Sequence, residues 1–368
     1  MWLQLFLFLL AFIVWQKYES NGGNSKAIRH KYVNFLIVIL FLQSALRHEA
    51  VGLDTYSYIK DFEITRDVRD WNWVWQNFYD VYVLGEGKDA GFHLLMKSFS
   101  TLCPYSRIWL FFVAILFFIP FCRLAEKELR SLKQLFMFFC VYQTMYYSFF
   151  SITGIRQTIA TVATLYGIKF IRQNKPIQFV FWILLAAFIH KSVLLFLPFY
   201  IIAKLSKSKC MLISVMTLLP VIFGLGRKFA FFMSDFAGGD QYLQYAESDM
   251  KAGATKFLIF IMLGAILTLI SKMRKPDSMP DIWVFAVSLT LLFTPLAWVD
   301  TSLMRVIQYF ALFSMISIPL SIDNLGLSKK VQNNVYWIFF AALLITTIRH
   351  DYGYCFFWQD MVLGSNYK

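Results

Sequence analysis

Long apolar runs, each bounded by short polar segments, dominate the pattern of hydrophobic and polar positions along this chain. A helix that crosses a bilayer needs about 20 mostly apolar residues, and helices satisfy all of their backbone polar groups internally. The pattern therefore predicts an all-α, polytopic integral membrane protein with about 11 transmembrane helices. The apolar runs are residues 2–15, 33–46, 108–121, 135–150, 155–171, 177–205, 211–225, 257–269, 282–298, 303–320 and 335–348.

One of these runs is unusually long and has a polar centre. Residues 177–205 contain the triplet His190-Lys191-Ser192 near their middle. If the run breaks there, it forms a re-entrant helical hairpin whose limbs of about 13 residues reach roughly 20 Å, which is short for a full span. Such an element is tolerated where protein or a water-filled cavity surrounds it. The alternative is one tilted helix, kinked by Pro198, with His190 satisfied inside the bundle.

The charges between the runs predict the orientation, because cytoplasmic loops are enriched in Lys and Arg. If the hairpin is present, the basic clusters all fall on the cytoplasmic side. They are residues 17–31, 123–133, 172–175, 204–209 and 272–275. Residues 47–107 carry an excess of Asp and Glu and are predicted to be external. We therefore expect a single transmembrane domain over residues 1–368 with a large external loop at 47–107.

The composition agrees with this class and argues against others. Of the residues, 58% are hydrophobic and 19% aromatic, whereas only 15% are charged, so no soluble domain is left over. The net charge of +13 is spread over loops and forms no stripe along one face, so nucleic acid is not an expected partner. The sequence contains no Walker loop, dinucleotide fingerprint, zinc-type spacing or G-x-S-x-G elbow. Neither a cofactor nor a metal ion is expected.

Polar residues from distant segments fall at the external ends of the predicted helices. Arg47, Arg156 and Arg305 share that face with Asp54 and His190. An arginine near a membrane helix is costly unless it is paired, interfacial or bound to substrate, and its planar fork matches phosphate oxygens. The convergence predicts a site for an anionic, membrane-bound substrate.

Each of these residues also has a structural interpretation. A lone arginine near a helix end often snorkels to lipid headgroups. His190 is alternatively a packing histidine, and Asp54 can form an Asx turn. For the cluster Trp71, Trp73 and Trp75, an aromatic belt at the membrane interface is favoured over a sugar-stacking platform.

Four short elements, taken in succession, resemble a known family. They are Arg-x-x-x-V-G-x-D-T-x-x-Y at 47–58, G-I-R-Q-x-I-A at 154–160, F-I-H-K-S at 188–192 and Arg-x-x-x-Tyr at 305–309. On these elements the chain resembles the EpsG family of polysaccharide polymerases over residues 47–310. It is also similar in plan to the wider Wzy O-antigen polymerases. The first two elements are the most specific.

The resemblance implies a GT-C-like, multi-pass glycosyltransferase of the bacterial cytoplasmic (inner) membrane, with its active site facing the periplasm or exterior. Such an enzyme transfers a growing chain from its undecaprenyl pyrophosphate carrier to an incoming lipid-linked oligosaccharide unit. The product would be O-antigen of lipopolysaccharide, capsule or exopolysaccharide. Donor, acceptor and membrane lipid are the implied partners, and a chain-length regulator is a further candidate.

The resemblance also suggests roles for the candidate residues. Arg156 and Arg305 would stabilise negative charge on the departing pyrophosphate. The general base that deprotonates the acceptor hydroxyl would be His190 or Asp54, and both stay open. The residues expected to bind substrate are Arg47, Gln157, Lys191, Tyr56, Tyr58 and Tyr309.

Two other classes of protein fit part of the pattern. A ligase of lipid-linked oligosaccharides would differ from a polymerase only in its acceptor. A flippase or transporter of the same units would place cationic or titratable groups at mid-membrane depth in both halves, whereas here these groups crowd one face. The crowding favours an enzyme.

Overall fold

A computed structural model describes residues 2–23, 25–52, 54–205, 207–237, 255–300, 303–349 and 353–360. Within these ranges the regular structure is helical, apart from one isolated antiparallel bridge between Arg47 and Phe356. The predicted all-α fold is therefore confirmed. The chain divides into two compact units, Met1–Leu194 with Phe340–Lys368, and Leu195–Phe339. The expectation of a single transmembrane domain stays a prediction.

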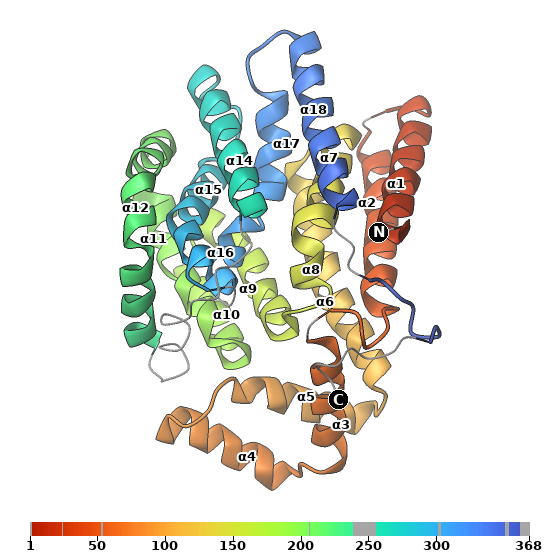
Figure 1. Ribbon diagram of the computed structural model, residues 1–368, viewed down its shortest axis with the longest axis vertical. Coiled ribbons are helices and arrows are strands. Elements are labelled where there is room, and N and C mark those ends of the chain that lie inside the picture. The colour runs from red at the N-terminus through yellow and green to blue at the C-terminus, as the bar shows by residue number, and fades with distance from the viewer. Residues whose placement is uncertain are drawn as a thin grey trace. The chain divides into compact units, whose positions relative to one another are not determined.

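The first unit is built mainly from long apolar helices (Figure 1). They are α1 (Trp2–Ser20), α2 (Lys26–Ala45), α6 (Ser106–Glu128), α7 (Leu132–Val141), a π-helical turn (Tyr142–Tyr146), α8 (Tyr147–Phe150), α9 (Ile155–Arg172) and α10 (Pro176–Ile189). Helix α6 packs between α2 and α9, and α10 packs along α9. The apolar runs predicted at 2–15, 33–46, 108–121, 135–150 and 155–171 correspond to these elements.

Local chemistry explains where several of these helices begin. The Ser25 hydroxyl accepts a hydrogen bond from the Ile28 backbone N–H at the start of α2. Ser131 and Gln134 form a capping box at the start of α7, which satisfies two otherwise unpaired backbone donors. Pro176 is the first residue of α10, a position where its missing N–H costs nothing.

The segment 47–107, predicted as a large external loop, is largely helical. It forms α3 (Thr55–Asp67), α4 (Trp71–Tyr79) with a π-helical continuation (Asp80–Leu84), and α5 (Ala90–Leu102). These helices are too short or too polar to read as spans, so the hydropathy pattern did not reveal them. Phe62, Phe92 and Trp109 pack together and attach α3 and α5 to the start of α6.

The run 177–205 is broken where its polar triplet predicts. Helix α10 ends at Ile189, a 3₁₀ turn spans Lys191–Phe196, and α11 covers Pro198–Leu205. Pro198 therefore begins a new helix instead of kinking a continuous one. The alternative of a single kinked helix is wrong, whereas the expectation that both ends lie on one side of the membrane stays a prediction.

The second unit contains α11 and the helices that follow it. They are α12 (Ser208–Ala237), α14 (Thr255–Arg274), α15 (Asp281–Phe293) with a 3₁₀ turn (Thr294–Trp298), α16 (Met304–Ala311), α17 (Ser314–Asp323) and the first part of α18 (Lys329–Ile348). Helix α15 is buried along almost its whole length and packs against α12, α14, α16 and α17. Part of the mixed loop predicted at 227–256 belongs to α12, and residues 238–254 lie outside the described ranges.

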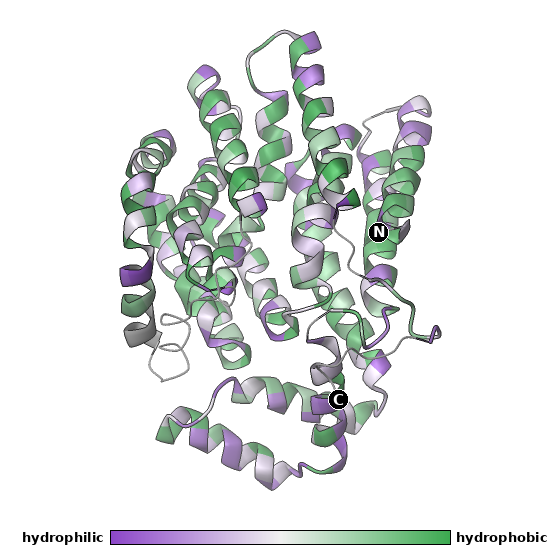
Figure 2. Ribbon diagram, viewed as in Figure 1, coloured by the Kyte–Doolittle hydropathy of each residue, from purple (hydrophilic) through white to green (hydrophobic). Residues whose placement is uncertain are grey.

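Several helices have the length and apolar composition of membrane spans. Five described helices meet both requirements by length and composition: α6, α14, α18, the first part of α12, and α15 with its 3₁₀ turn. The pair α16 and α17, bent by 44°, would make a sixth. Figure 2 shows hydrophobic residues along the bundle helices and more hydrophilic ones on α3 and α4. The chain is an integral membrane protein, and the expected total of about 11 spans stays a prediction.

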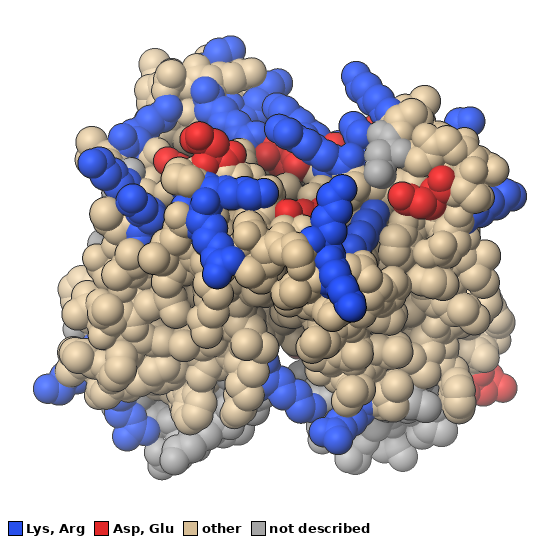
Figure 3. All heavy atoms as spheres, turned by 90° about the horizontal axis from the view of Figure 1, so that it is seen from above, with Lys and Arg blue, Asp and Glu red and all other residues tan. Residues whose placement is uncertain are grey.

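Basic residues gather at one end of the first unit. Arg29 donates to the Arg130 carbonyl, and Arg123 contacts both His30 and Glu126. At the same end, the last residue of α9, Arg172, forms an ion pair with Glu128. Figure 3, which looks onto an end of the helices, shows many more Lys and Arg than Asp and Glu side chains. Three basic segments that hydropathy placed on one side of the membrane therefore meet in space.

Candidate functional site

At the opposite end of α9, one buried carboxylate joins three segments that are far apart in sequence. Asp89 Oδ2 accepts hydrogen bonds from Arg156 Nη1 at 3.0 Å and from His190 Nδ1 at 3.1 Å. Its other oxygen, Oδ1, accepts from the backbone N–H of Lys191 at 3.3 Å. The start of α5, the start of α9 and the end of α10 thus meet at a single side chain. We call Asp89, Arg156 and His190 the carboxylate cluster.

The backbone around Asp89 brings the carboxylate to this position. Asp89 itself has a left-handed conformation, with φ of 55°, and ends a turn that contains Gly85 and Gly87. Two residues later, Gly91 lies so close to Phe188 that an added Cβ would be 2.5 Å from the Phe188 carbonyl oxygen. Only glycine permits this approach of α5 to the end of α10.

The electrostatics of the cluster favour an ionised Asp89. The carboxylate is 5% exposed, and burial alone would raise its pKa. The hydrogen bond from His190, the charges of His190 and Arg156 and the Lys191 N–H outweigh burial and hold the pKa of Asp89 below its ordinary value. Asp89 is therefore a carboxylate at neutral pH and accepts hydrogen bonds only.

An ionised Asp89 determines which nitrogen of His190 carries the proton. Because a carboxylate cannot donate, His190 must donate from Nδ1, and a neutral imidazole then has a bare acceptor at Nε2. His190 is 8% exposed, and its Nε2 is buried without a hydrogen-bond partner among the described residues. This is the arrangement of a general base that a carboxylate orients.

Arg156 adds a positively charged fork next to this base. Its side chain is 25% exposed, compared with 4% for that of Asp89, so the guanidinium reaches the border of the buried cluster. The guanidinium lies 5.8 Å from the ring centroids of both Tyr58 and Phe92. A guanidinium has five donors, of which the ion pair with Asp89 uses one. The group can therefore hold its carboxylate and still offer donors to an anion.

The element at 47–58 and the turn before α9 contact each other directly. Gly52 has φ of 88°, and an added Cβ there would be 2.1 Å from the Ile152 carbonyl oxygen. The Thr55 hydroxyl donates to that same carbonyl at 3.1 Å and accepts from Arg47 Nε at 3.1 Å. These contacts fix the start of α3, and with it Tyr58, against the start of α9.

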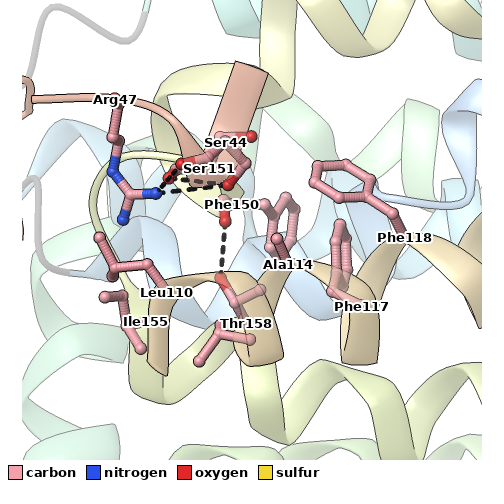
Figure 4. Close-up of a pocket in the computed structure, with 11 residues that line it drawn as sticks. Ser44, Arg47, Leu110, Ala114, Phe117, Phe118, Phe150, Ser151, Ile155 and Thr158 are labelled. Carbon is pink, nitrogen blue, oxygen red and sulfur yellow. Dashed lines mark hydrogen bonds between the residues drawn. The ribbon is translucent and has the colours of Figure 1, made fainter. Parts of the chain in front are cut away.

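Arg47 is part of this support and lies outside the carboxylate cluster. It is 2% exposed, and Figure 4 shows its guanidinium directed at the Ser44 oxygens near the end of α2. The adjacent cavity measures about 10 Å³, room for one water molecule at most. Burial lowers the pKa of Arg47 to about 10, so the group is still charged at neutral pH. Its role in substrate binding stays a prediction.

Three other predicted residues of the first unit lie at the start of α3 or of α9. Asp54 precedes α3, is half-buried and makes no capping hydrogen bond with its side chain. Its backbone carbonyl accepts from the Tyr58 N–H at 3.0 Å, which places Asp54 one turn from the ring that contacts Arg156. Tyr56 is also half-buried, and Gln157 is buried in α9.

Arg305 and Tyr309 belong to the second unit. Both lie on α16, where Tyr309 and its neighbour Gln308 are buried and Arg305 is half-buried. Asp300, just before this helix, is also buried. The expectation that Arg305 acts together with Arg156 stays a prediction.

Sequence reasoning missed Asp89, which it treated only as one of many acidic residues of the external segment. A local signal was present: Asp89 follows a Gly-x-Gly turn and directly precedes Ala-Gly-Phe, the first residues of α5. Within the described ranges, no group of three or more His, Cys, Asp or Glu side chains is arranged so that it could hold a metal ion.

Comparison with known proteins gives one match. The model of a family described as the EpsG family matches residues 30–362, a range that includes all four sequence elements and the carboxylate cluster. Neither a curated protein nor a solved structure matches the chain.

Proposed function

The chain belongs to the EpsG family, and from this premise we propose that it polymerises oligosaccharide repeat units carried on undecaprenyl pyrophosphate. The family suggests a polysaccharide polymerase in general. The observation that carries the more specific proposal is the carboxylate cluster, in which an oriented histidine with a bare Nε2 lies beside an arginine fork. Glycosyl transfer from a pyrophosphate uses a base for the acceptor hydroxyl and a positive charge for the leaving group, and these two groups can supply both.

The proposed step uses each group of the cluster once. A hydroxyl of the acceptor sugar attacks the anomeric carbon of the donor, and its proton passes to His190 Nε2. The bond between that carbon and the pyrophosphate oxygen breaks, and the electron pair leaves with the undecaprenyl pyrophosphate. Arg156 stabilises the negative charge that develops on this leaving group. Asp89 holds the His190 ring in the required tautomer and stabilises its charged form.

Other residues take supporting roles in this proposal. The backbone N–H of Lys191 donates to Asp89, and in this proposal its exposed side chain would be a second phosphate contact. Tyr58, beside Arg156, and Tyr56 would contact sugar, and Gln157 and Tyr309 would contact substrate. Arg305 would be a further charge-stabilising arginine, Arg47 a more distant one, and Asp54 is the alternative base.

The cluster is proposed to face the outside of the bacterial cytoplasmic membrane. Arg156 begins α9 and Arg172 ends it among the basic residues, so the two groups lie at opposite ends of an 18-residue helix. At 1.5 Å per residue this helix is about 27 Å long, close to the thickness of the hydrocarbon core. Since basic residues favour the cytoplasmic side, the cluster would lie at the external surface.

This position also favours a transferase over a flippase, which needs charged groups at mid-membrane depth. A ligase would use the same cluster and differ in its acceptor. Deletion of the gene separates these classes, because cells without a polymerase still display single repeat units outside. Cells without a flippase do not display them, and cells without a ligase make long chains that stay on the carrier lipid.

The base is tested by expressing His190→Ala and Asp54→Asn in a deletion strain and separating the glycans by gel electrophoresis. We expect His190→Ala to leave single-repeat product with normal protein level, and Asp54→Asn to give long chains. A general base typically contributes about 10² to 10⁴ in rate. Long chains from His190→Ala would reject this role for His190, and their loss in Asp54→Asn alone would move the role to Asp54.

A further inference from the structure

An apolar groove runs from the carboxylate cluster along the first unit. It has a volume of about 490 Å³ and is formed by α5, α6, α9 and α10, with Phe78 of α4 at one border. Its walls include Leu94, Leu95, Leu116, Val162, Ala163 and Leu185. The lining is almost entirely apolar: its one hydroxyl, that of Ser98, donates to the Leu94 carbonyl, and the only other polar side-chain group among the lining residues is the indole N–H of Trp182. We call this feature the α9 groove.

The α9 groove reaches the immediate neighbours of the cluster residues. Gly91 and Phe188, whose close approach brings Asp89 to His190, both line it, and so does Ile189, the neighbour of His190. On α9 the lining residues Ile159 and Ala163 lie three and seven positions after Arg156. Residues at this spacing share one helix face, so α9 offers a guanidinium followed by an apolar stripe about 10 Å long.

A guanidinium followed by an apolar groove matches an amphiphile with a compact anionic head and a single long apolar chain. We propose that the α9 groove holds the polyprenyl chain of the lipid-linked donor, with the pyrophosphate at Arg156 and Lys191. The inference rests on the proposed function and adds to it where the carrier lipid lies. Arg156 keeps guanidinium donors that its ion pair with Asp89 does not use, so an anion at the cluster end is favoured.

The groove is open to the surface of the protein on the apolar α10 side, as entry of a lipid requires. Leu185 lines the groove and is still 47% exposed. Its neighbour Leu184 is 46% exposed and does not line the groove. The two leucines are therefore equally exposed, but only Leu185 contacts the groove. Leu184 serves as the matched control.

The test places the photoreactive amino acid p-benzoylphenylalanine at Leu185 or at Leu184 in the full-length protein in nanodiscs. Radiolabelled undecaprenyl pyrophosphate is added and the sample is irradiated. We expect strong labelling of the protein at position 185 and background labelling at 184. Unlabelled undecaprenyl pyrophosphate should abolish the signal, whereas phosphatidylglycerol at the same concentration should not.

Equal labelling at the two positions, or equal competition by phosphatidylglycerol, would overturn the inference, because the groove would then hold ordinary bilayer lipid. A second measurement uses Ala163→Phe, which fills the groove, with Leu184→Phe as control. Displacing about two methylene groups should weaken binding of undecaprenyl pyrophosphate about tenfold in the first variant only. Unchanged binding in Ala163→Phe would count against the groove.

Failure of this inference and failure of the proposed function give different results. If His190→Ala abolishes long chains but position 185 is not labelled selectively, the groove assignment alone is wrong. If position 185 is labelled selectively but His190→Ala still makes long chains, the carrier lipid binds as proposed and the assignment of the base is wrong.

Discussion

His190 and Asp89, which lie 101 residues apart in the sequence, are joined by a 3.1 Å hydrogen bond between Nδ1 and Oδ2. Through this contact Asp89, one of many acidic residues of the segment 47–107, is the hydrogen-bond partner of the candidate base. The first prediction follows from this contact and concerns a change of Asp89.

Asp89→Asn should reduce polymer formation on the order of a hundredfold. An asparagine can donate its amide N–H to His190 Nδ1, which would leave the proton on Nε2 and remove the acceptor that the reaction needs. The measurement is the amount of long-chain glycan in a deletion strain. Asp67→Asn, at an exposed carboxylate of the same segment, is the control and should behave as wild type. An Asp89→Asn variant that makes normal chains would show that Asp89 does not orient the base.

Arg156→Lys tests the arginine fork. Lysine keeps the charge but loses the planar arrangement of donors, so loss of one transition-state contact should cost about 3 kcal/mol, or roughly a hundredfold in rate. Arg172→Lys changes the other end of the same helix and should leave the glycan ladder unchanged. If Arg156→Lys also gives a wild-type ladder, the planar fork does not stabilise the transition state, and the positive charge beside Asp89 is sufficient.

Gly91→Ala should destabilise the protein by about 1–3 kcal/mol, because the new methyl group would overlap the backbone of Phe188. The matched control is Gly224→Ala, since a Cβ at Gly224 in α12 meets nothing within 4 Å. Alanine is also the better helix former there. Thermal unfolding of the two purified variants in detergent measures the difference. Equal melting temperatures would show that α5 can move away from α10 at little cost.

Cysteine labelling tests which side of the membrane the cluster faces. We introduce single cysteines at Glu86, between α4 and α5, and at Lys127, near the basic end of α6. An impermeant thiol reagent added to intact cells should label position 86 and not 127. The reverse result would place the carboxylate cluster inside the cell and would exclude an external polymerase.

The apolar helices and the break after Ile189 were readable from the sequence because both depend on local pattern, whereas the breaks within the runs 135–150, 282–298 and 303–320 were not predicted. The polar triplet after Ile189 interrupts an apolar run, and the structure ends α10 at that residue. The helices α3 and α5 were not predicted, because they are amphipathic or polar and are stabilised by contacts such as those of Phe62 and Phe92 with Trp109. Hydropathy alone does not contain those contacts.

The candidate site was only partly readable for a related reason. Arg156 and His190 stand out because each is a costly residue at the edge of an apolar run. Asp89 does not stand out, since its burial depends on the approach of Gly91 to Phe188, which joins segments about 100 residues apart. Arg47 is a different case: the sequence predicts it as a substrate ligand, and in the structure its guanidinium donates to Ser44 and Thr55, which its local sequence did not reveal.

The distance along the chain between Asp89 and His190 has a consequence for biosynthesis. At about 5–20 residues per second, roughly 5–20 s pass between synthesis of the carboxylate and synthesis of its histidine partner. Arg156 is made in between, so the ion pair can form before the histidine arrives. Until then Asp89 has no compensating charge from these residues and must stay in contact with water, because an unpaired carboxylate is costly in lipid. The segment around α5 therefore completes its packing only after α10 has been inserted.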